Sequence, residues 1–289
     1  MTAEPVAVAP TEQVRLAVTD DPASAVATNR RRAMTLAVLP GVVLLVIGAV
    51  VGAAAGALVV GVVVGAALGV VAVVGLRRAA PGIVLRGLRA EPIDEDDVPG
   101  IATLVEGLCA TLGLTQPTLY SVDERMPNAL AVGRGSSDAA LVCTTGLIDG
   151  GLDPVVLEGV LAHELTHVKR DDVAPATIAA ALVLSVGRVV PVGGAGMVHR
   201  IAGRGREFAT DRQAIRATRY PPGLRQALAA LWEAPPSGSG GIVVRRAGQV
   251  TRWLWTSVLP DAQGMRPSGA EMVGELDLPS VRIAALDEW

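Results

Sequence analysis

The longest apolar segment of the chain runs from Ala33 to Leu76 without a single charged residue. Arginines bound this segment on both sides, at positions 30–32 and 77–78. One membrane-spanning helix needs about 20 residues, so the segment is long enough for two crossings and too long for one. The pattern therefore predicts a transmembrane helical hairpin over residues 33–76, with its turn near Gly52–Gly56.

Glycines recur at every fourth position within each half of this hairpin, at Gly48, Gly52 and Gly56 and again at Gly61, Gly65 and Gly69. Such spacing lets transmembrane helices approach each other closely. Small residues are also abundant throughout the chain, so composition alone explains the same spacing equally well.

The segments around the hairpin predict its orientation and the domain boundaries. Arginines on both flanks place both hairpin ends in the cytoplasm under the positive-inside rule. Residues 1–32 have no periodic apolar face and are expected to form a flexible tail. A cleavable signal peptide is not expected, because the apolar segment is far longer than a signal-peptide core and begins only after these 32 residues. Residues 77–98 are predicted to be a juxtamembrane linker, and residues 99–289 a folded cytoplasmic domain.

The most informative polar pattern is His163-Glu-Leu-Thr-His167. The two histidines are four residues apart, so on a helix both imidazoles can reach one metal ion, and Glu164 can reach water at that metal. This HExxH pattern is typical of zinc peptidases, in which the glutamate acts as the general base. A surface helix can carry the same string without a metal, so the rest of the site has to be found elsewhere in the chain.

A third protein ligand is needed for a catalytic zinc ion. Arg170 and Val173 stand where a metzincin would have glycine and histidine, which excludes that class. Asp171 and Asp172 are the nearest acids after the histidine motif and are expected to cap the helix end or to form salt bridges there.

Glu207 and Asp211 form a second pair with helical i, i+4 spacing. We expect Glu207 to be the third ligand. We expect Asp211 to accept a hydrogen bond from the second nitrogen of a zinc-bound histidine, which would fix the orientation of the ring.

These segments together resemble the HtpX-like and CAAX prenyl protease family of membrane zinc metallopeptidases. The matching stretches are Pro127-Asn-Ala-Leu-Ala-Val-Gly133, Thr145-Gly-Leu-Ile148, the histidine motif and Arg206-Glu-Phe-Ala-Thr-Asp211, with a weaker likeness at Pro279–Leu286. The resemblance implies a mainly α-helical fold with a small β-sheet (α+β), built from an N-terminal transmembrane hairpin and a zincin-like metallopeptidase domain.

The same resemblance implies roles for individual residues. His163, His167 and Glu207 would bind one Zn²⁺ per chain, and Glu164 would be the general base. Asp211 would accept a hydrogen bond from one of the zinc-bound histidines. Asn128 and Ala129 would lie on an edge strand that pairs with an extended polypeptide substrate, because a free edge offers N–H and C=O groups. The other interpretation of Asn128 is a turn residue after Pro127.

A second apolar stretch, Val173–Val198, separates the two halves of this predicted site. A single membrane crossing would place Glu207 on the opposite side from the histidines, so the stretch has to return to the side it left. We expect a helix over residues 176–186, broken near Pro191, that dips into the membrane or packs on the hairpin. The residues that follow offer three candidates for stabilising an oxyanion, namely His199, Arg206 and Arg212. An interfacial or capping role is the other interpretation of His199.

Charge and composition narrow the class of function. The net charge is −3, and the chain has no Gly-rich phosphate loop, so nucleic acid is not expected as a partner. Cys109 and Cys143 have no metal-binding spacing and suit a reducing compartment. Lys169 is the single lysine beside many arginines, which is typical of GC-rich bacterial genomes and favours a bacterial inner membrane.

The expected function is a membrane-anchored zinc endopeptidase that hydrolyses membrane or misfolded proteins, with the lipid bilayer and a polypeptide as its partners. A non-cleaving membrane scaffold or sensor that keeps the peptidase fold is the alternative. A CAAX-processing enzyme is a third hypothesis, which the small size of the hairpin disfavours.

Overall fold

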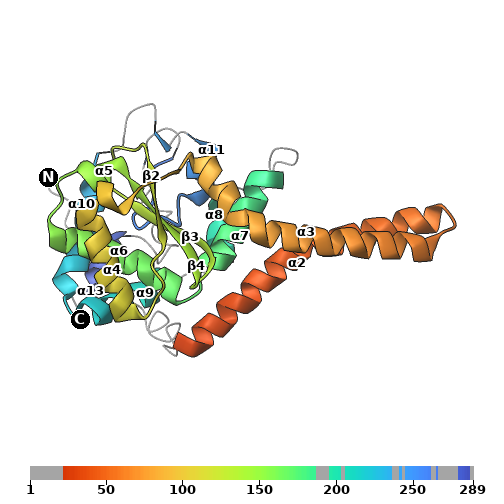
Figure 1. Cartoon of the computed structure of the whole chain (residues 1–289), viewed down its shortest axis with the longest axis horizontal. Helices are drawn as coiled ribbons and strands as arrows, with labels where there is room; N and C mark the ends of the chain where they lie inside the picture. The colour runs from red at the N-terminus through yellow and green to blue at the C-terminus, as the bar shows by residue number, and fades with distance from the viewer. Residues whose placement is uncertain are drawn as a thin grey trace, which may run out of the picture.

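The protein is a long helical hairpin projecting from a rounded domain (Figure 1). The computed structural model describes residues 22–186, 195–202, 206–235, 241–242, 245–261, 265 and 279–286. The hairpin consists of α2 (Pro22–Ala54) and α3 (Leu58–Leu88), joined by a turn in which Gly56 has a positive φ of 71°. The predicted hairpin and the place of its turn are confirmed.

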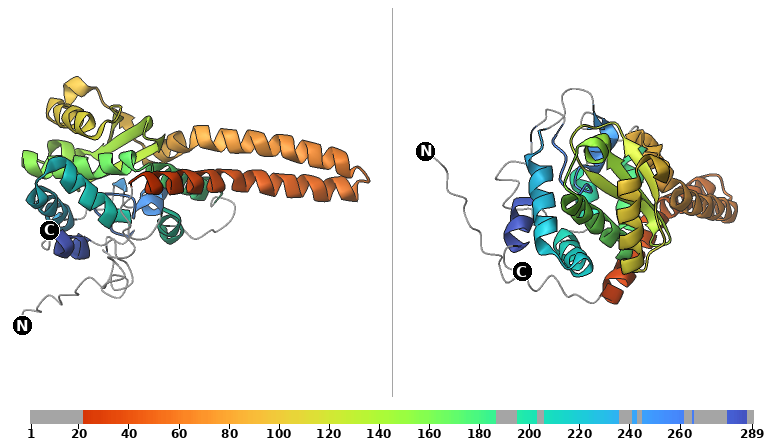
Figure 2. Two further views of the ribbon diagram at one scale, coloured as in Figure 1. Left: turned by 90° about the horizontal axis from the view of Figure 1, so that it is seen from below. Right: turned by 60° about the vertical axis from the view of Figure 1, so that its left-hand side comes forward.

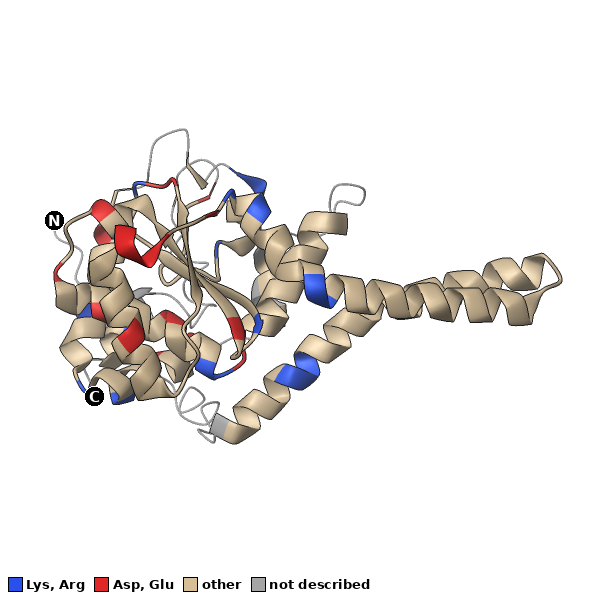
Figure 3. Ribbon diagram, viewed as in Figure 1, with Lys and Arg blue, Asp and Glu red and all other residues tan. Residues whose placement is uncertain are grey.

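Both hairpin helices are long and apolar enough to cross a membrane. Their apolar side chains face outward, with Val59 75% exposed and Val71 68% exposed, which a core helix of a water-soluble protein would not tolerate over such a length. Figure 3 shows that the projecting arm carries no charged residue beyond its base.

Glycines bring the backbones of α2 and α3 into direct contact. A methyl group added at Gly52 would lie 2.7 Å from the Cα of Gly61, and one added at Gly48 would lie 2.8 Å from the Cα of Gly65. The structure therefore favours close helix approach as the reason for the glycine spacing. Gly56 is the exception, because it lies in the turn and a Cβ there would contact nothing.

We expect the substitution Gly61→Ala to destabilise the hairpin by about 1–3 kcal/mol, the usual cost of overpacking. The added methyl group would lie 2.6 Å from the Cα of Gly52, so the helices would have to separate. The measurement is the melting temperature of the detergent-solubilised protein. Gly75→Ala is the control, because it lies on the same helix with no atom within 4 Å of the added Cβ. Equal melting temperatures for the two variants would mean that the backbones do not touch at Gly61.

The two hairpin helices extend further than the sequence predicted. Residues 22–32 belong to α2 instead of a flexible tail, and residues 77–88 continue α3 instead of forming a linker. The added turns find partners on the rounded domain: Asn29 donates to the carbonyl of Arg170 at 3.1 Å, and Arg30 forms a 2.6 Å ion pair with Asp171. Residues 1–21, the rest of the predicted tail, lie outside the described residues.

A four-stranded sheet forms the centre of the rounded domain. It consists of β1 (Glu91–Pro92), β2 (Thr118–Val122), β3 (Ala129–Gly135) and β4 (Asp138–Thr144), in the order β1-β2-β4-β3. The β2–β4 pair is parallel, whereas β1–β2 and β3–β4 are antiparallel. Within this sheet β3 is an edge strand, as the sequence predicted for the segment after Asn128.

Helices cover both faces of the sheet (Figure 2). Leu141 and Cys143 point to one face and pack with α4 (Pro99–Leu112) and α6 (Pro154–Lys169). Leu130 and Val142 point to the other face and pack with the base of α3 and with α7 (Val173–Val186). This alternation places α6 and α7, which are consecutive in the chain, on opposite faces of one sheet.

The remaining elements complete the domain and confirm the α+β fold class. They are η1 (Glu95–Asp97), α5 (Thr145–Asp149), α8 (Ala195–Ala202), α9 (Arg206–Thr218), α10 (Pro221–Glu233), α11 (Arg246–Thr251) and α13 (Pro279–Leu286). Helices α9 and α10 both pack on α6, and α13 packs on α9 and α10.

The described parts of the second apolar stretch are helix α7, which begins three residues earlier than predicted, and residues 195–198 at the start of α8. Helix α7 is buried over residues 173–181, is exposed at its last two residues, and packs on α2, α3 and β3. Of the two expected arrangements, the structure has the helix packed on the hairpin. Residues 187–194, where the break was predicted, lie outside the described residues.

Candidate metal and catalytic site

Helix α6 carries the histidine motif through the middle of the domain. Asp153 caps its N-terminus by accepting a hydrogen bond from the amide of Val155 at 2.8 Å, and Pro154 occupies the first helical position. His163, Glu164 and His167 are at most 2% exposed, because the sheet, α9 and α10 surround the second half of the helix. A polar motif buried this deeply needs partners for every charged group.

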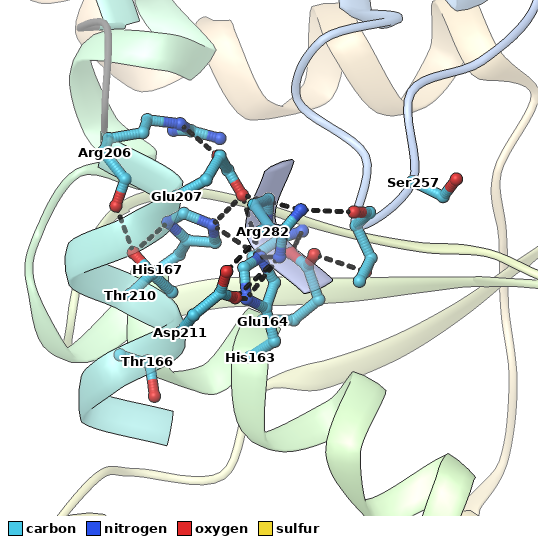
Figure 4. A network of polar contacts seen from close by, with 12 residues as sticks. His163, Glu164, Thr166, His167, Arg206, Glu207, Thr210, Asp211, Ser257 and Arg282 are labelled. Carbon is cyan, nitrogen blue, oxygen red and sulfur yellow. Dashed lines mark hydrogen bonds and ion pairs between the residues drawn. The ribbon is translucent and has the colours of Figure 1, made fainter. Parts of the chain in front are cut away.

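Three donor atoms from α6 and α9 converge at the centre of the site (Figure 4). The Nε2 atoms of His163 and His167 are 3.0 Å apart, and Oε2 of Glu207 lies 3.0 Å from the first and 3.4 Å from the second. Glu164 also offers an oxygen within 4.8 Å of both histidines. The structure thus brings together the two histidines and Glu164 of the HExxH motif and Glu207 of the second i, i+4 pair.

A different carboxylate stands behind each histidine. Nδ1 of His163 lies 2.8 Å from Oδ1 of Asp211, and Nδ1 of His167 lies 2.9 Å from Oδ1 of Asp172. A carboxylate can only accept, so in the neutral rings each Nδ1 carries the proton and each Nε2 keeps a lone pair directed at the centre. The pairing of Asp211 with a histidine is the arrangement expected from the sequence.

The salt bridges expected of Asp171 and Asp172 are present, with Arg30 and Arg170, but the sequence analysis missed the contact of Asp172 with His167. Asp171 adopts a left-handed conformation with φ 55°, and this sharp corner turns Asp172 back towards His167. The Asp171 carboxylate is held in turn by the amide of Ser136 at 2.6 Å and by Arg30 of α2. The corner that positions Asp172 is therefore tied to both the sheet and the hairpin.

Both oxygens of Glu164 are oriented by hydrogen bonds from other segments. The hydroxyl of Thr256 donates to Oε1 at 2.6 Å, and the amide of Ala131 on β3 donates to Oε2 at 2.8 Å. These two bonds hold the carboxylate beside the three donor atoms. No local sequence pattern pointed to Thr256, which is 92 residues away in the chain.

Arg282 of α13 is another residue that the sequence analysis left without a role. Its guanidinium is 1% exposed and binds the carboxylate of Asp211 through two bonds of 2.7 Å. It also donates to the carbonyl of Thr256 at 2.8 Å. Pro279–Leu286 had been noted as a weak family likeness, and that likeness was the available signal for this arginine.

The electrostatics of the site favour a bound cation. Among the described residues, Glu164, Asp172, Glu207 and Asp211 bring negative charge into the cluster. Arg282 is buried with them, and the half-buried Arg206 and Arg170 lie at the side of the cluster, next to Glu207 and Asp172. Burial lowers the pKa of His167, but the carboxylates of Asp172 and Glu207 outweigh it and raise that pKa to about 9. The carboxylates around His167 thus stabilise positive charge at the place where a bound metal would supply it.

The same pairing keeps the acids ionised. Burial acts to raise the pKa of Glu207, yet His167 and Arg206 outweigh that effect and hold it well below its usual range. For Asp211 the opposing effect of burial is outweighed chiefly by Arg282, so its pKa is also lowered.

Asn128 and Ala129 lie at the edge of the sheet but are buried. The side chain of Asn128 donates to the carbonyl of Ser257 at 2.6 Å and accepts from the amide of Ser257 at 3.1 Å. The carbonyl of Ala129 accepts from the amide of Thr256 at 3.0 Å. The edge groups expected to be free for a substrate are thus used by residues 256–257 in this structure, which corrects the expectation of an open edge at these two positions.

The three oxyanion candidates are placed differently. Arg206 donates a hydrogen bond to Oε1 of Glu207 at 2.8 Å, so it orients the candidate metal ligand Glu207. Arg212 is partly exposed on α9. His199 belongs to α8, and its side chain lies outside the described part of the chain.

The model of peptidase family M48 matches residues 98–288, which is about two thirds of the chain. The chain belongs to peptidase family M48. All the site residues described above lie inside the M48 match, and the N-terminal hairpin lies before it.

Curated relatives agree with membership of M48. The chain is 32% identical over 173 residues to a protease HtpX homolog of Sulfurovum sp. (strain NBC37-1), covering 51% of this chain and 62% of the relative. It is 34% identical over 174 residues to a protease HtpX homolog of Tropheryma whipplei (strain Twist), covering 49% and 59%. The matched region thus spans about 60% of the length of these relatives. No solved structure matches the chain significantly.

Proposed function

We propose that this M48 protein is a membrane-anchored, zinc-dependent endopeptidase of the bacterial inner membrane. The observation that carries the proposal is the convergence of the His163, His167 and Glu207 donor atoms at 3.0–3.4 Å, with Glu164 beside them. The exposed apolar hairpin supports the membrane anchor. Arginines at both hairpin ends support a cytoplasmic location for the catalytic domain.

The donor set fits zinc. Ligand atoms about 2 Å from a tetrahedral zinc ion lie about 3.3 Å from one another, which is close to the three separations in this site. Two imidazoles and one carboxylate, with a fourth position left over, are the ligands of one class of catalytic zinc site. Asp211 and Asp172 would keep the two rings in the tautomer that binds the metal through Nε2.

In the proposed reaction Glu164 is the general base. Zinc, when bound, supplies a Lewis acid that polarises the scissile carbonyl and acidifies water. Glu164 takes a proton from the attacking water and then delivers it to the leaving amine, which breaks the peptide bond. Thr256 and Ala131 hold the carboxylate in place for the first transfer and have to release one oxygen for it.

Binding of an extended polypeptide to β3 requires a rearrangement. The carbonyl of Ala129 would offer a substrate strand its first hydrogen bond, but Thr256 occupies it. We therefore propose that the segment around residues 256–257 moves away from the strand before substrate binds.

A non-cleaving scaffold is the second candidate, and one observation favours it. The candidate catalytic residues are buried, and Arg282 packs against His163 at 3.2 Å. A fold that keeps this arrangement permanently would retain the metal site but admit no substrate.

The test is metal analysis and casein cleavage by the full chain purified in detergent. We expect one zinc ion per chain, cleavage of casein, loss of both after treatment with a chelator, and recovery when zinc is returned. Zinc without cleavage would favour the scaffold. Protein that cleaves casein after complete zinc removal would refute the proposed chemistry, and wild-type protein that binds no zinc would refute the site.

A further inference from the structure

A second polar site lies where the hairpin meets the rounded domain. A cavity of about 670 Å³ opens between the end of α3, the end of α7 and the start of α11. Its lining combines four arginines with apolar side chains: Arg86, Arg89, Arg245 and Arg246, together with Ile83, Leu184 and Ala247. None of these residues belongs to the candidate catalytic site.

Close packing of three helices holds the arginines together. A Cβ added at Gly87 would lie 3.0 Å from the Cβ of Ala247 and 3.5 Å from a methyl of Leu184, so α3 touches both α11 and α7 at this glycine. Arg245 donates to the carbonyl of Leu88 at 3.0 Å, and Arg246 donates to the carbonyl of Val183 at 2.9 Å. These bonds orient the two guanidinium groups and leave their other N–H groups available.

The cluster has no neutralising acid within the described residues. None of the four arginines forms an ion pair with a described carboxylate, and the cavity lining contains no Asp or Glu. Capping of the C-terminal carbonyls of α3 and α7 accounts for one bond each of Arg245 and Arg246. It does not account for Arg86 and Arg89, which are exposed and add like charge to the same cavity.

The composition of the cavity matches a phosphate group on an amphiphile. Guanidinium groups bind phosphate through paired, charge-assisted hydrogen bonds. Arg86 lies nine residues beyond Arg77 on α3, about 13 Å along the helix, so the cavity lies outside the hydrocarbon layer, on the side that holds the rounded domain. Ile83 and Leu184 supply an apolar wall beside the arginines.

We propose that the pocket of Arg86, Arg89, Arg245 and Arg246 binds a phosphate group, contributed by the headgroup of an anionic phospholipid. The site would tie the catalytic domain to the membrane surface at the base of the hairpin. The inference uses the proposed membrane position of α3 but not the peptidase activity, so it is tested by binding alone.

The test measures binding to the full-length protein in a zwitterionic or uncharged detergent. The probes are short-chain phosphatidylglycerol, short-chain phosphatidylcholine and inorganic phosphate, with binding followed by calorimetry. We expect phosphatidylglycerol to bind and phosphatidylcholine not to bind. The double variant R86Q/R89Q should weaken phosphatidylglycerol binding by about 30-fold, since an arginine at an anionic surface contributes about a factor of five.

The control is R77Q/R78Q, which removes the same charge from the same helix outside the cavity. It should bind phosphatidylglycerol within about twofold of wild type, in line with the small effect of a non-contacting charge. Inorganic phosphate binding as tightly as the lipid would support the phosphate site and assign it to free phosphate. The proposal would be overturned if neither phosphatidylglycerol nor inorganic phosphate binds. It would also be overturned by equal losses of phosphatidylglycerol binding in the two double variants, or by unchanged binding in R86Q/R89Q.

Discussion

Replacing Glu164 by glutamine is expected to reduce casein cleavage by about 10²–10⁴-fold while one zinc ion stays bound, because a positioned general base contributes a factor of that size. Glutamine keeps the shape of the side chain. Its amide oxygen can accept from the amide of Ala131, and its amide nitrogen can donate to the hydroxyl of Thr256, which can also act as an acceptor. The substitution therefore removes the proton acceptor and leaves the fold and the three donor atoms intact.

The measurement pairs initial cleavage rates with zinc content and melting temperature for each preparation. Glu158→Gln is a matched control on the same helix, because Glu158 is partly exposed and lies away from the cluster. It should cleave at the wild-type rate. A Glu164→Gln protein that is folded, loaded with zinc and as active as a cleaving wild type would remove Glu164 from the mechanism. If neither protein cleaves casein, the scaffold hypothesis gains support.

Replacing Glu207 by alanine is expected to weaken zinc binding by at least about 100-fold. Loss of a residue that hydrogen-bonds to a metal ligand costs about 10–100-fold in metal affinity, and loss of a direct ligand should cost more. The Oε2 atom of Glu207 is the contribution of α9 to the set of three donors, at 3.0 and 3.4 Å from the two histidines. Without it, only two protein ligands remain at the proposed site. Zinc affinity is measured by competition with a chromogenic chelator at fixed pH.

Two comparison variants make this result specific. Glu106→Ala removes an exposed glutamate from α4 and should leave zinc affinity unchanged. Asp172→Asn alters only the residue behind His167 and should give an intermediate loss of about 10–100-fold. Undiminished zinc affinity in Glu207→Ala would show that the third ligand comes from another residue.

The local part of the candidate catalytic site could be predicted from sequence because it depends on helical spacing. Residues four apart share one face of a helix, so His163 with His167, and Glu207 with Asp211, were recognisable as pairs before any tertiary contact was known. The charge-free hairpin was predictable for a similar reason, since its length and composition are local properties. The extent of the hairpin helices was not, because Asn29 and Arg30 become ordered through contacts with the loop after α6.

The remaining parts of the site depend on contacts between distant segments. Arg282 binds Asp211 across 71 residues, and Thr256 reaches Glu164 across 92. The role of Asp172 depends on the left-handed conformation of Asp171, which spacing along a regular helix does not predict. The closed edge of β3 likewise follows from the position of residues 256–257 in the tertiary structure.

The sequence by itself determined the membrane hairpin, the two i, i+4 pairs of candidate site residues and the family resemblance, because each depends on the order and spacing of residues within short segments. The tertiary structure alone decided which carboxylate supports which histidine, how Glu164 is held, and that four arginines from separate elements share one cavity. The physical reason is that burial and electrostatic pairing depend on distance in space, and long-range packing of helices on the sheet sets those distances.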